Sequence, residues 1–323
     1  MESNDFYCFQ QDDSELSAKE HESAHYLLVG FDTEFKTPSV ALSPAEVKEE
    51  GKARSLILSY QFHAKTSEGL EWSGICCPDG DERITLQDFM IFVLGTGARV
   101  HGIPNLPIKV YLVGHFTRAD IPAFADFQDL TKYMSAVRST FVTTNDHFHG
   151  ILIPTLDDEV KLKVFLRDTM LLTPQSSKSL KALGELVGVE KVELTPDREE
   201  FKRIIRNMDK LRYENWDLFK RYALTDAEIC VRYMEKVIDQ YKQVTGNFKV
   251  PITLTRIGVD LLLKSWSDEG LDYLWMLGKE RIKQSYYSKT KGRYIYKTDD
   301  VEIACVHREP PMRNRWFEPT RIN

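Results

Sequence analysis

The sequence predicts an α/β protein, and three segments carry that prediction. Residues 27–35 and 108–115 are strongly apolar runs, typical of strands buried on both faces. Residues 179–187 repeat apolar positions with a helical period and stop at Gly188, a residue favoured just past a helix end. With 323 residues, of which 42% are hydrophobic and 28% charged, the composition is that of a soluble globular protein with a sizeable core.

Composition also excludes several classes of protein. No apolar run approaches the roughly 20 residues that a membrane span needs. The acidic N-terminus lacks a signal-peptide pattern, and the five cysteines show no Cys-x-x-Cys spacing. We therefore expect a cytoplasmic protein with neither a disulfide framework nor a zinc site, and no membrane partner.

Charge is distributed unevenly along the chain and suggests three regions. Residues 1–25 hold seven acids against Lys19 and few aliphatic side chains, which predicts a disordered acidic arm. Residues 26–247 hold the predicted sheet and most of the helices. Residues 248–323 form a helical and basic, tyrosine-rich extension, and residues 279–297 carry seven lysines or arginines against Glu280.

The remaining elements follow from turn residues and periodicity. A loop with prolines and a glycine follows the first strand at residues 36–53, and Asp120 is expected to open a helix that passes Phe124. Further helices are expected to start at Thr195-Pro196 and to be capped by Asp217. We predict strands over residues 55–62 and 70–77, a helix over 85–95, hairpin strands over 139–143, 151–155 and 162–167, and helices over 218–246 and 253–267.

Two carboxylates close the first apolar strand. Asp32 and Glu34 lie two residues apart and therefore project from the same side of the strand, with Thr33 on the opposite side. Like charges this close repel unless a proton or cation lies between them, and hard divalent cations prefer carboxylate oxygens. An isolated Asp-x-Glu is more often a pair of solvated acids on a strand that leaves the core.

A later segment offers further polar groups on one helical face. Tyr222 and Asp226 are four residues apart and share a face of the predicted helix, while Leu224, Ile229 and Val231 supply its core side. Taken by itself, Tyr-x-x-x-Asp is common and usually structural.

Together, three segments resemble the exonuclease motifs of the DEDD (DnaQ-like) superfamily. They are Asp32-Thr33-Glu34 on a strand, the segment from Val113 to Asp120 after a strand, and Tyr222 with Asp226 on a late helix. The resemblance covers residues 26–245 and is closest to the proofreading exonuclease portion of B-family DNA polymerases, with no polymerase region expected. Arg221 stands where one branch of the superfamily has histidine, so this chain resembles the tyrosine branch.

The resemblance implies an RNase H-like fold, a mixed central sheet flanked by helices, and two-metal chemistry with Mg²⁺ or Mn²⁺. It implies that Asp32 bridges both ions, that Glu34 and Asp226 bind the ion nearer the attacking water, and that Asp120 binds the other. Tyr222 would orient the water, because a phenol with a pKa near 10 is a poor base at neutral pH. These five residues are the predicted catalytic set, and the four acids are the predicted metal ligands.

The chain departs from the family pattern around the second motif. Phe116 and Ala119 stand where the family often has asparagine and an aromatic residue, so contacts to the terminal nucleotide are expected to differ. Asp126 is a weaker substitute for Asp120, and Asp168 is expected to be structural. We predict that the substrate contacts are made by Thr33, Phe35, His115 and Phe116.

Other motifs give weaker evidence of function. His147 and His149 have no companion ligands and are expected in a loop, and no phosphate-binding glycine loop or nucleophilic serine motif occurs. The basic extension interleaves cations with tyrosines, a mixture suited to single strands, although a solvated charged hairpin explains it equally well. Its candidate substrate contacts are Lys283, Lys289, Lys291 and Arg293.

The predicted function is 3′–5′ exonuclease action on single-stranded or frayed DNA. One rival keeps this chemistry with RNA as the substrate. A second is a DEDD-like module that binds nucleic acid or a protein partner with little hydrolysis.

Overall fold

A computed structural model describes most of the chain and divides it into two compact units, Met1–Leu254 and Thr255–Asn323, which are treated separately below. The described residues are 25–36, 55–80, 82–102, 107, 109–138, 140–143, 152–154, 159–174, 178–277, 279–288 and 293–302. The expected acidic arm, the loop after the first strand, and His147 and His149 lie outside them, apart from a few bordering residues.

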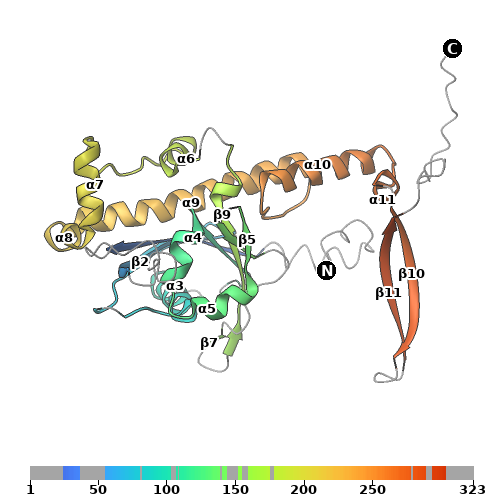
Figure 1. The fold of residues 1–323 in the computed structure, drawn as a ribbon, viewed down its shortest axis with the longest axis horizontal. Helices are drawn as coiled ribbons and strands as arrows, with labels where there is room; N and C mark the ends of the chain where they lie inside the picture. Colours follow the sequence, from blue (N-terminus) through green and yellow to red (C-terminus); the bar gives the residue numbers. More distant parts are fainter. Residues whose placement is uncertain are drawn as a thin grey trace, which may run out of the picture. The chain divides into compact units, whose positions relative to one another are not determined.

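A five-stranded mixed sheet forms the centre of the first unit (Figure 1). Its strand order is β3-β2-β1-β4-β9. β1 pairs in parallel with β4, and β4 with β9, whereas β2 runs antiparallel to β1 and β3. The α/β class is confirmed, and the sheet is consistent with an RNase H-like fold. The strands are β1 (Leu27–Lys36), β2 (Leu56–Thr66), β3 (Glu71–Cys76), β4 (Lys109–Gly114) and β9 (Lys163–Asp168).

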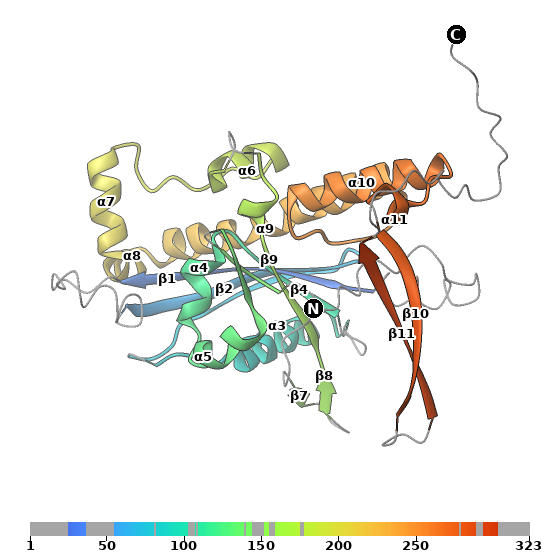
Figure 2. The same cartoon turned by 45° about the vertical axis from the view of Figure 1, so that its right-hand side comes forward.

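Helices cover both faces of this sheet (Figure 2). α3 (Leu86–His101) packs on one face, and the long α9 (Trp216–Thr245) crosses β1 and β2 on the other. Alternation along β1 explains the division, because Phe31 contacts Phe89 of α3 while Gly30 faces Ala227 of α9. Within the described ranges, no helix is both long and apolar enough to cross a membrane.

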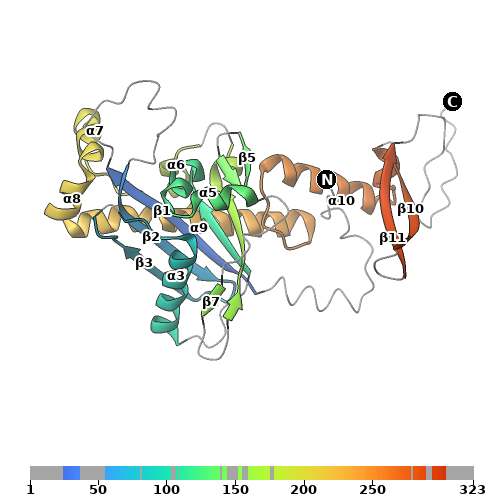
Figure 3. The same ribbon diagram turned by 60° about the horizontal axis from the view of Figure 1, so that its bottom comes forward.

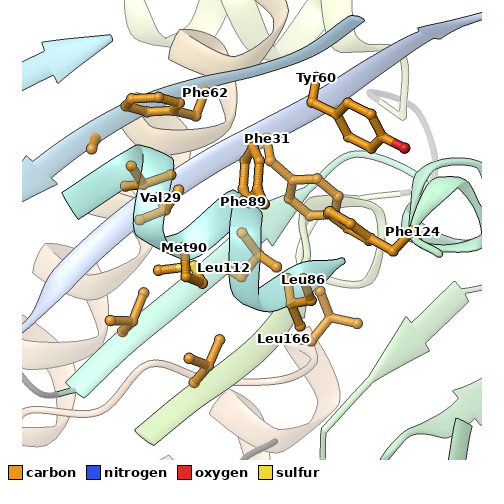
Figure 4. Packing of buried hydrophobic residues seen from close by; sticks show 14 of the residues in the cluster. Val29, Phe31, Tyr60, Phe62, Leu86, Phe89, Met90, Leu112, Phe124 and Leu166 are labelled. Carbon is orange, nitrogen blue, oxygen red and sulfur yellow. The ribbon is translucent and has the colours of Figure 1, made fainter. Parts of the chain in front are cut away.

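The main core lies between the sheet and α3 and is rich in aromatic rings (Figure 4). Contacting rings in this core have their centroids 5.5–6.5 Å apart and meet edge-on or tilted. The rings are those of Phe31, Tyr60, Phe89 and Phe124. A second buried cluster lies on the α9 side and comprises Leu58, Met208, Phe219 and Tyr222. This second cluster places Tyr222 next to the strands that carry the acids.

Capping side chains fix two of the predicted helices. Thr85 accepts from the Asp88 backbone in a capping box that begins α3, which runs six residues beyond the predicted end at 95 to His101. α6 (Leu180–Val187) begins after Ser179 and ends at Gly188 with φ 74°, as the sequence predicts.

The segment after β4 corrects one prediction. Asp120 does not open a helix but ends the short α4 (Thr117–Asp120), which continues as the 3₁₀ turn η3 (Ile121–Ala123). Phe124 is extended, with φ −72° and ψ 141°, so the helical path breaks before α5 (Phe127–Leu130), followed by the 3₁₀ turn η4 (Thr131–Tyr133). Pro122 removes one backbone donor inside this segment.

The expected hairpin region also differs. β9 joins the main sheet beside β4 instead of forming a hairpin, because its side chains Val164 and Leu166 are fully buried. It is followed by the 3₁₀ turn η5 (Thr169–Leu171). Two small antiparallel pairs precede it, β5 (Ser135–Val137) with β6 (Thr140–Val142) and β7 (Leu152–Pro154) with β8 (Glu159–Lys161).

Two helix starts are shifted by short-range capping. Asp197 is the N-cap of α7 (Arg198–Arg206), while Thr195 donates to Glu200 instead. Asn215 is the N-cap of α9, two residues before the predicted Asp217. A further helix, α8 (Met208–Glu214), lies between them.

The second unit contains helices and a hairpin. α10 (Leu254–Asp268) and α11 (Tyr273–Met276) precede β10 (Lys279–Ser288), which pairs antiparallel with β11 (Arg293–Glu302), drawn in red in Figure 3. The basic segment, residues 279–297, therefore supplies β10 and the first half of β11. Lys283 and Arg293 lie on its strands, opposite Thr298 and Ser288, and Lys289 and Lys291 fall outside the described residues.

Candidate functional site

Acids from three separate segments approach the end of β1. Asp32 and Glu34 lie on the side of the strand that faces α9, and α9 supplies Asp226. Glu34, Asp226 and Asp120 are 9%, 6% and 3% exposed. The three sequence segments lie close together, because Thr33 of β1 bonds to Asp120, Gly30 of β1 packs against α9, and the charges of Asp120, Glu34 and Asp226 act on Asp32.

The close approach of α9 to β1 positions Asp226. A Cβ on Gly30 would lie 2.0 Å from the Ala227 carbonyl oxygen, so only glycine lets the helix backbone come this near to the strand. Asp226 precedes Ala227, and Tyr222 lies one turn earlier on the same helix, 7% exposed. The backbone contact therefore brings the phenol and the carboxylate to the acids of β1.

Burial and mutual repulsion disfavour ionisation of the acids. Burial, followed by the charges of Asp120, Glu34 and Asp226, raises the pKa of Asp32 well above its usual range. Burial and the Asp226 charge raise the pKa of Glu34 to about 8. Glu34 therefore holds a proton more readily than an exposed glutamate does.

Lys191 enters this acidic site and was not foreseen from the sequence. Its Nζ lies 2.5 Å from Asp226 Oδ2 and 5.1 Å from the centre of the Tyr222 ring. Burial raises the pKa of Asp226, and the ammonium offsets part of that rise. No local pattern marks Lys191, because its contact is made with a residue 35 positions away.

Two polar residues of β2 support Asp32 from the neighbouring strand. Gln61 is the cross-strand partner of Asp32 and donates from Nε2 to Asp32 Oδ2 at 2.8 Å, while Ser59 donates to Gln61 Oε1 at 2.9 Å. Both side chains are fully buried. Their spacing is the sequence signal that was available, since polar residues two apart in an apolar strand share one face.

The second motif is held from two sides. Asp168 is fully buried and accepts from the backbone N–H groups of Phe116, Thr117 and Met170, at 2.7–3.2 Å. Its role is structural, as the sequence suggests. It stabilises Phe116 in a left-handed conformation with φ 70°, which a bulky residue adopts at a cost. At the other end of the motif, Thr33 donates to Asp120 Oδ1 at 2.8 Å.

The structure places the four predicted substrate contacts of the first unit in different surroundings. Thr33 is 4% exposed and bonded to Asp120, and Phe35 packs partly against the main core. His115 Nδ1 lies 2.8 Å from Thr169 Oγ1, and Phe116 is half-buried. The structure thus does not gather these four residues on one open surface. Asp126 accepts from the Leu86 backbone N–H at 3.0 Å, away from the acids.

The donor set fits hard divalent cations. All four acids offer oxygen, the ligand type that Mg²⁺ and Mn²⁺ prefer. Asp226 Oδ1 is buried and has no hydrogen-bond partner in the described part of the chain, so it is available to an ion. Among the same residues, no three histidine, cysteine or carboxylate side chains form a ready-made metal cluster, and Lys191 takes the second Asp226 oxygen.

The buried acids at the end of β1 come from three separate segments of the chain. No family model matches the sequence. The chain is 25% identical over 313 residues to the primer-independent DNA polymerase PolB of Escherichia coli. That match covers 87% of this chain and 34% of PolB, so the chain spans well under half the length of this relative.

Proposed function

We propose that this chain is a metal-dependent 3′–5′ exonuclease that removes nucleotides from single-stranded or frayed ends of DNA. The observation that carries the proposal is the convergence of Asp32, Glu34, Asp120 and Asp226 from three separate segments, with Tyr222 beside them. Isolated solvated acids, the rival explanation of the Asp-x-Glu pair, do not account for buried acids from distant segments.

Asp32, Glu34, Asp120 and Asp226 would hold two Mg²⁺ or Mn²⁺ ions. Such a pair, when bound, supplies a nucleophile at neutral pH and neutralises charge on the phosphoryl and leaving oxygens. The raised pKa values support this role, because carboxylates that repel one another without a counter-ion gain most from a cation. Glu34 must release its proton before it can act as a ligand.

Tyr222 would orient the attacking water without taking its proton. Burial and the nearby charges of Glu34 and Asp226 raise the pKa of its phenol even further above 10, so the hydroxyl stays protonated at neutral pH. It can therefore donate one hydrogen bond and accept another. Lys191, next to Asp226 and the Tyr222 ring, adds a positive charge to the site.

DNA is favoured over RNA as the substrate by the similarity to a DNA polymerase. The direction of attack, from the 3′ end, follows the resemblance of the three motifs to DEDD exonucleases. An alternative without hydrolysis rests on Phe116 and Ala119, which replace two residues that the family often uses near the terminal nucleotide.

The test uses single-stranded oligonucleotides of DNA and RNA, labelled at either end, with Mg²⁺, Mn²⁺ or EDTA. We expect DNA labelled at the 5′ end to shorten stepwise with either ion and not with EDTA. Asp226→Asn should abolish cleavage while leaving DNA binding largely intact. Tyr222→Phe should keep the fold and lower turnover by roughly 10- to 1000-fold, the scale of losing one placed polar group.

Three results would contradict the proposal in different ways. Cleavage of RNA in preference to DNA would show that the substrate is RNA, with the proposed chemistry unchanged. Binding without cleavage under all conditions would favour the binding module. Wild-type turnover by Asp226→Asn, in preparations free of other nucleases, would exclude the carboxylate mechanism altogether.

A further inference from the structure

Asp120 differs from the other acids in the kind of backbone that carries it. Asp32 and Glu34 lie on a paired strand, and Asp226 lies on a 30-residue helix. Asp120 instead ends a helix of four residues that passes into a 3₁₀ turn. On so short and irregular a segment, contacts from other elements help to set the position of this carboxylate.

One such contact comes from Thr33. Its hydroxyl donates to Asp120 Oδ1 at 2.8 Å, across 87 residues of sequence. Thr33 and Asp120 are 4% and 3% exposed, so water does not compete for this bond. A hydroxyl that donates to a carboxylate makes a charge-assisted bond, stronger than one between neutral groups.

Thr33 also stands between two of the acids in sequence. Because side chains alternate along a strand, Thr33 points away from the α9 face on which Asp32 and Glu34 lie. β1 therefore supplies two acids from one face and the hydroxyl that bonds Asp120 from the other. Asp32 is fixed separately, by Gln61. Loss of the Thr33 hydroxyl therefore affects Asp120 and leaves the support of Asp32 in place.

We propose that Thr33 is a positioning residue that holds the Asp120 carboxylate in the orientation needed to bind a divalent cation. This inference rests on the proposed function, because it gives Asp120 the role of a metal ligand. Groups that hydrogen-bond to metal ligands typically change metal affinity by about 10- to 100-fold when removed. The near-complete burial of Thr33 is the observation that separates this role from contact with a substrate.

The experiment compares Thr33→Val, which removes the hydroxyl and keeps the shape, with Thr33→Ser, which keeps the hydroxyl. Thr245→Val is the matched control, because Thr245 is also 4% exposed and hydrogen-bonded but lies at the far end of α9. Mn²⁺ binding is measured by calorimetry on the full chain, and cleavage of a DNA oligonucleotide is measured at saturating substrate over a series of Mn²⁺ concentrations.

We expect Thr33→Val to raise the dissociation constant for Mn²⁺ at least tenfold and to lower kcat at limiting Mn²⁺, with KM for DNA nearly unchanged. Thr33→Ser should lie within about threefold of wild type, since the donor remains. Thr245→Val should bind Mn²⁺ as wild type does, even if its resistance to urea falls.

Two results overturn the inference. Mn²⁺ binding by Thr33→Val equal to that of wild type would show that Asp120 needs no such support. Equal losses in Thr33→Val and Thr33→Ser would attribute the effect to packing instead of the hydroxyl. Failure of the wild-type protein to bind Mn²⁺ or to cleave is distinguishable from both, because it removes the proposed function as well.

Discussion

His115 shows how one enclosed side chain makes stability depend on pH. The Thr169 hydroxyl donates its hydrogen to the Gly114 carbonyl oxygen at 3.3 Å. The same hydroxyl oxygen must therefore accept from His115 Nδ1, so we assign the imidazole hydrogen to Nδ1. Burial, with a smaller contribution from the Lys191 charge, lowers the pKa of His115 to about 4. The folded protein therefore keeps this ring neutral far below the pH at which the unfolded chain protonates it.

We predict that His115 makes the fold less stable as the pH falls from 6.5 to about 4. In that interval the unfolded state binds a proton that the folded state does not, so the free energy of unfolding drops by about 1.4 kcal/mol per pH unit. Asparagine at this position offers a non-titrating donor in place of Nδ1–H. The advantage of wild type over His115→Asn should shrink with this slope as the pH falls.

The measurement is urea denaturation of both proteins at pH 7, 6 and 5. Glu34, whose pKa is raised to about 8, gives an opposite slope above pH 4.5, but it is present in both proteins and cancels in the difference. Parallel curves for the two proteins across this range would remove His115 as a source of pH dependence.

At the scale of elements, the junction of β1 with α9 sets the geometry of the acids. Replacing Gly30 with alanine would put a methyl group 2.0 Å from a backbone oxygen of Ala227 and 2.9 Å from Val231 Cγ2. A backbone oxygen cannot move aside as a flexible side chain can. The strand and the helix must therefore separate, which moves Asp226 relative to Asp32.

We predict that Gly30→Ala lowers the free energy of unfolding by about 1–3 kcal/mol, the usual cost of overfilling a packed site. At a temperature where the variant is fully folded, its rate of cleavage should still be lower than that of wild type. Gly95→Ala is the matched control, because no atom lies within 4 Å of a Cβ at this exposed position of α3. That variant should gain up to about 1 kcal/mol from helix propensity.

Elements with strong local signals were predicted well. β1 and β4 match within a residue or two, because their apolar runs need no distant partner to be recognised, and Ser179 and Gly188 mark α6 at both ends. Asp120 was placed at the wrong end of its helix, since the break at Pro122 and Phe124 depends on packing against the core.

The carboxylate set is predicted from the resemblance of three motifs to DEDD exonucleases and stays a prediction, whereas the residues that contact these acids were not predicted. The hydrogen bond from Thr33 to Asp120 spans 87 residues, and the contact of Lys191 with Asp226 spans 35. Neither distance leaves a local pattern. Such contacts follow only once the sheet order β3-β2-β1-β4-β9 is known.

On the scale of the whole molecule, charge is segregated along the chain. The net charge is −6, yet residues 279–297 are strongly basic. The structure shows that this segment forms β10 and the first half of β11, whose last residues include Asp299, Asp300 and Glu302. A basic hairpin with tyrosines remains a candidate contact for the strand upstream of the cleaved end.

We predict that replacing Lys283, Lys289, Lys291 and Arg293 with glutamine weakens binding of single-stranded DNA and flattens its dependence on salt. Fewer counterions are released when fewer phosphates are neutralised. Cleavage at saturating substrate should change little, because the acids are untouched. Fluorescence anisotropy across a salt series, with Asp226→Asn as the background, measures both quantities.

An unchanged affinity and slope in the quadruple variant would identify the hairpin as an ordinary solvated surface. The exonuclease proposal does not depend on that outcome, since none of its catalytic residues lies in the second unit.

The ion pair between Lys191 and Asp226 bears on the state of the protein when divalent ions are scarce. That internal counter-ion and the raised pKa of Glu34, which favours a proton there, both lessen the repulsion among the acids. We therefore expect the fold to form without a divalent ion. Under the proposed function, scarcity of divalent ions would then stop cleavage and leave the fold intact, and a renewed supply would restore activity.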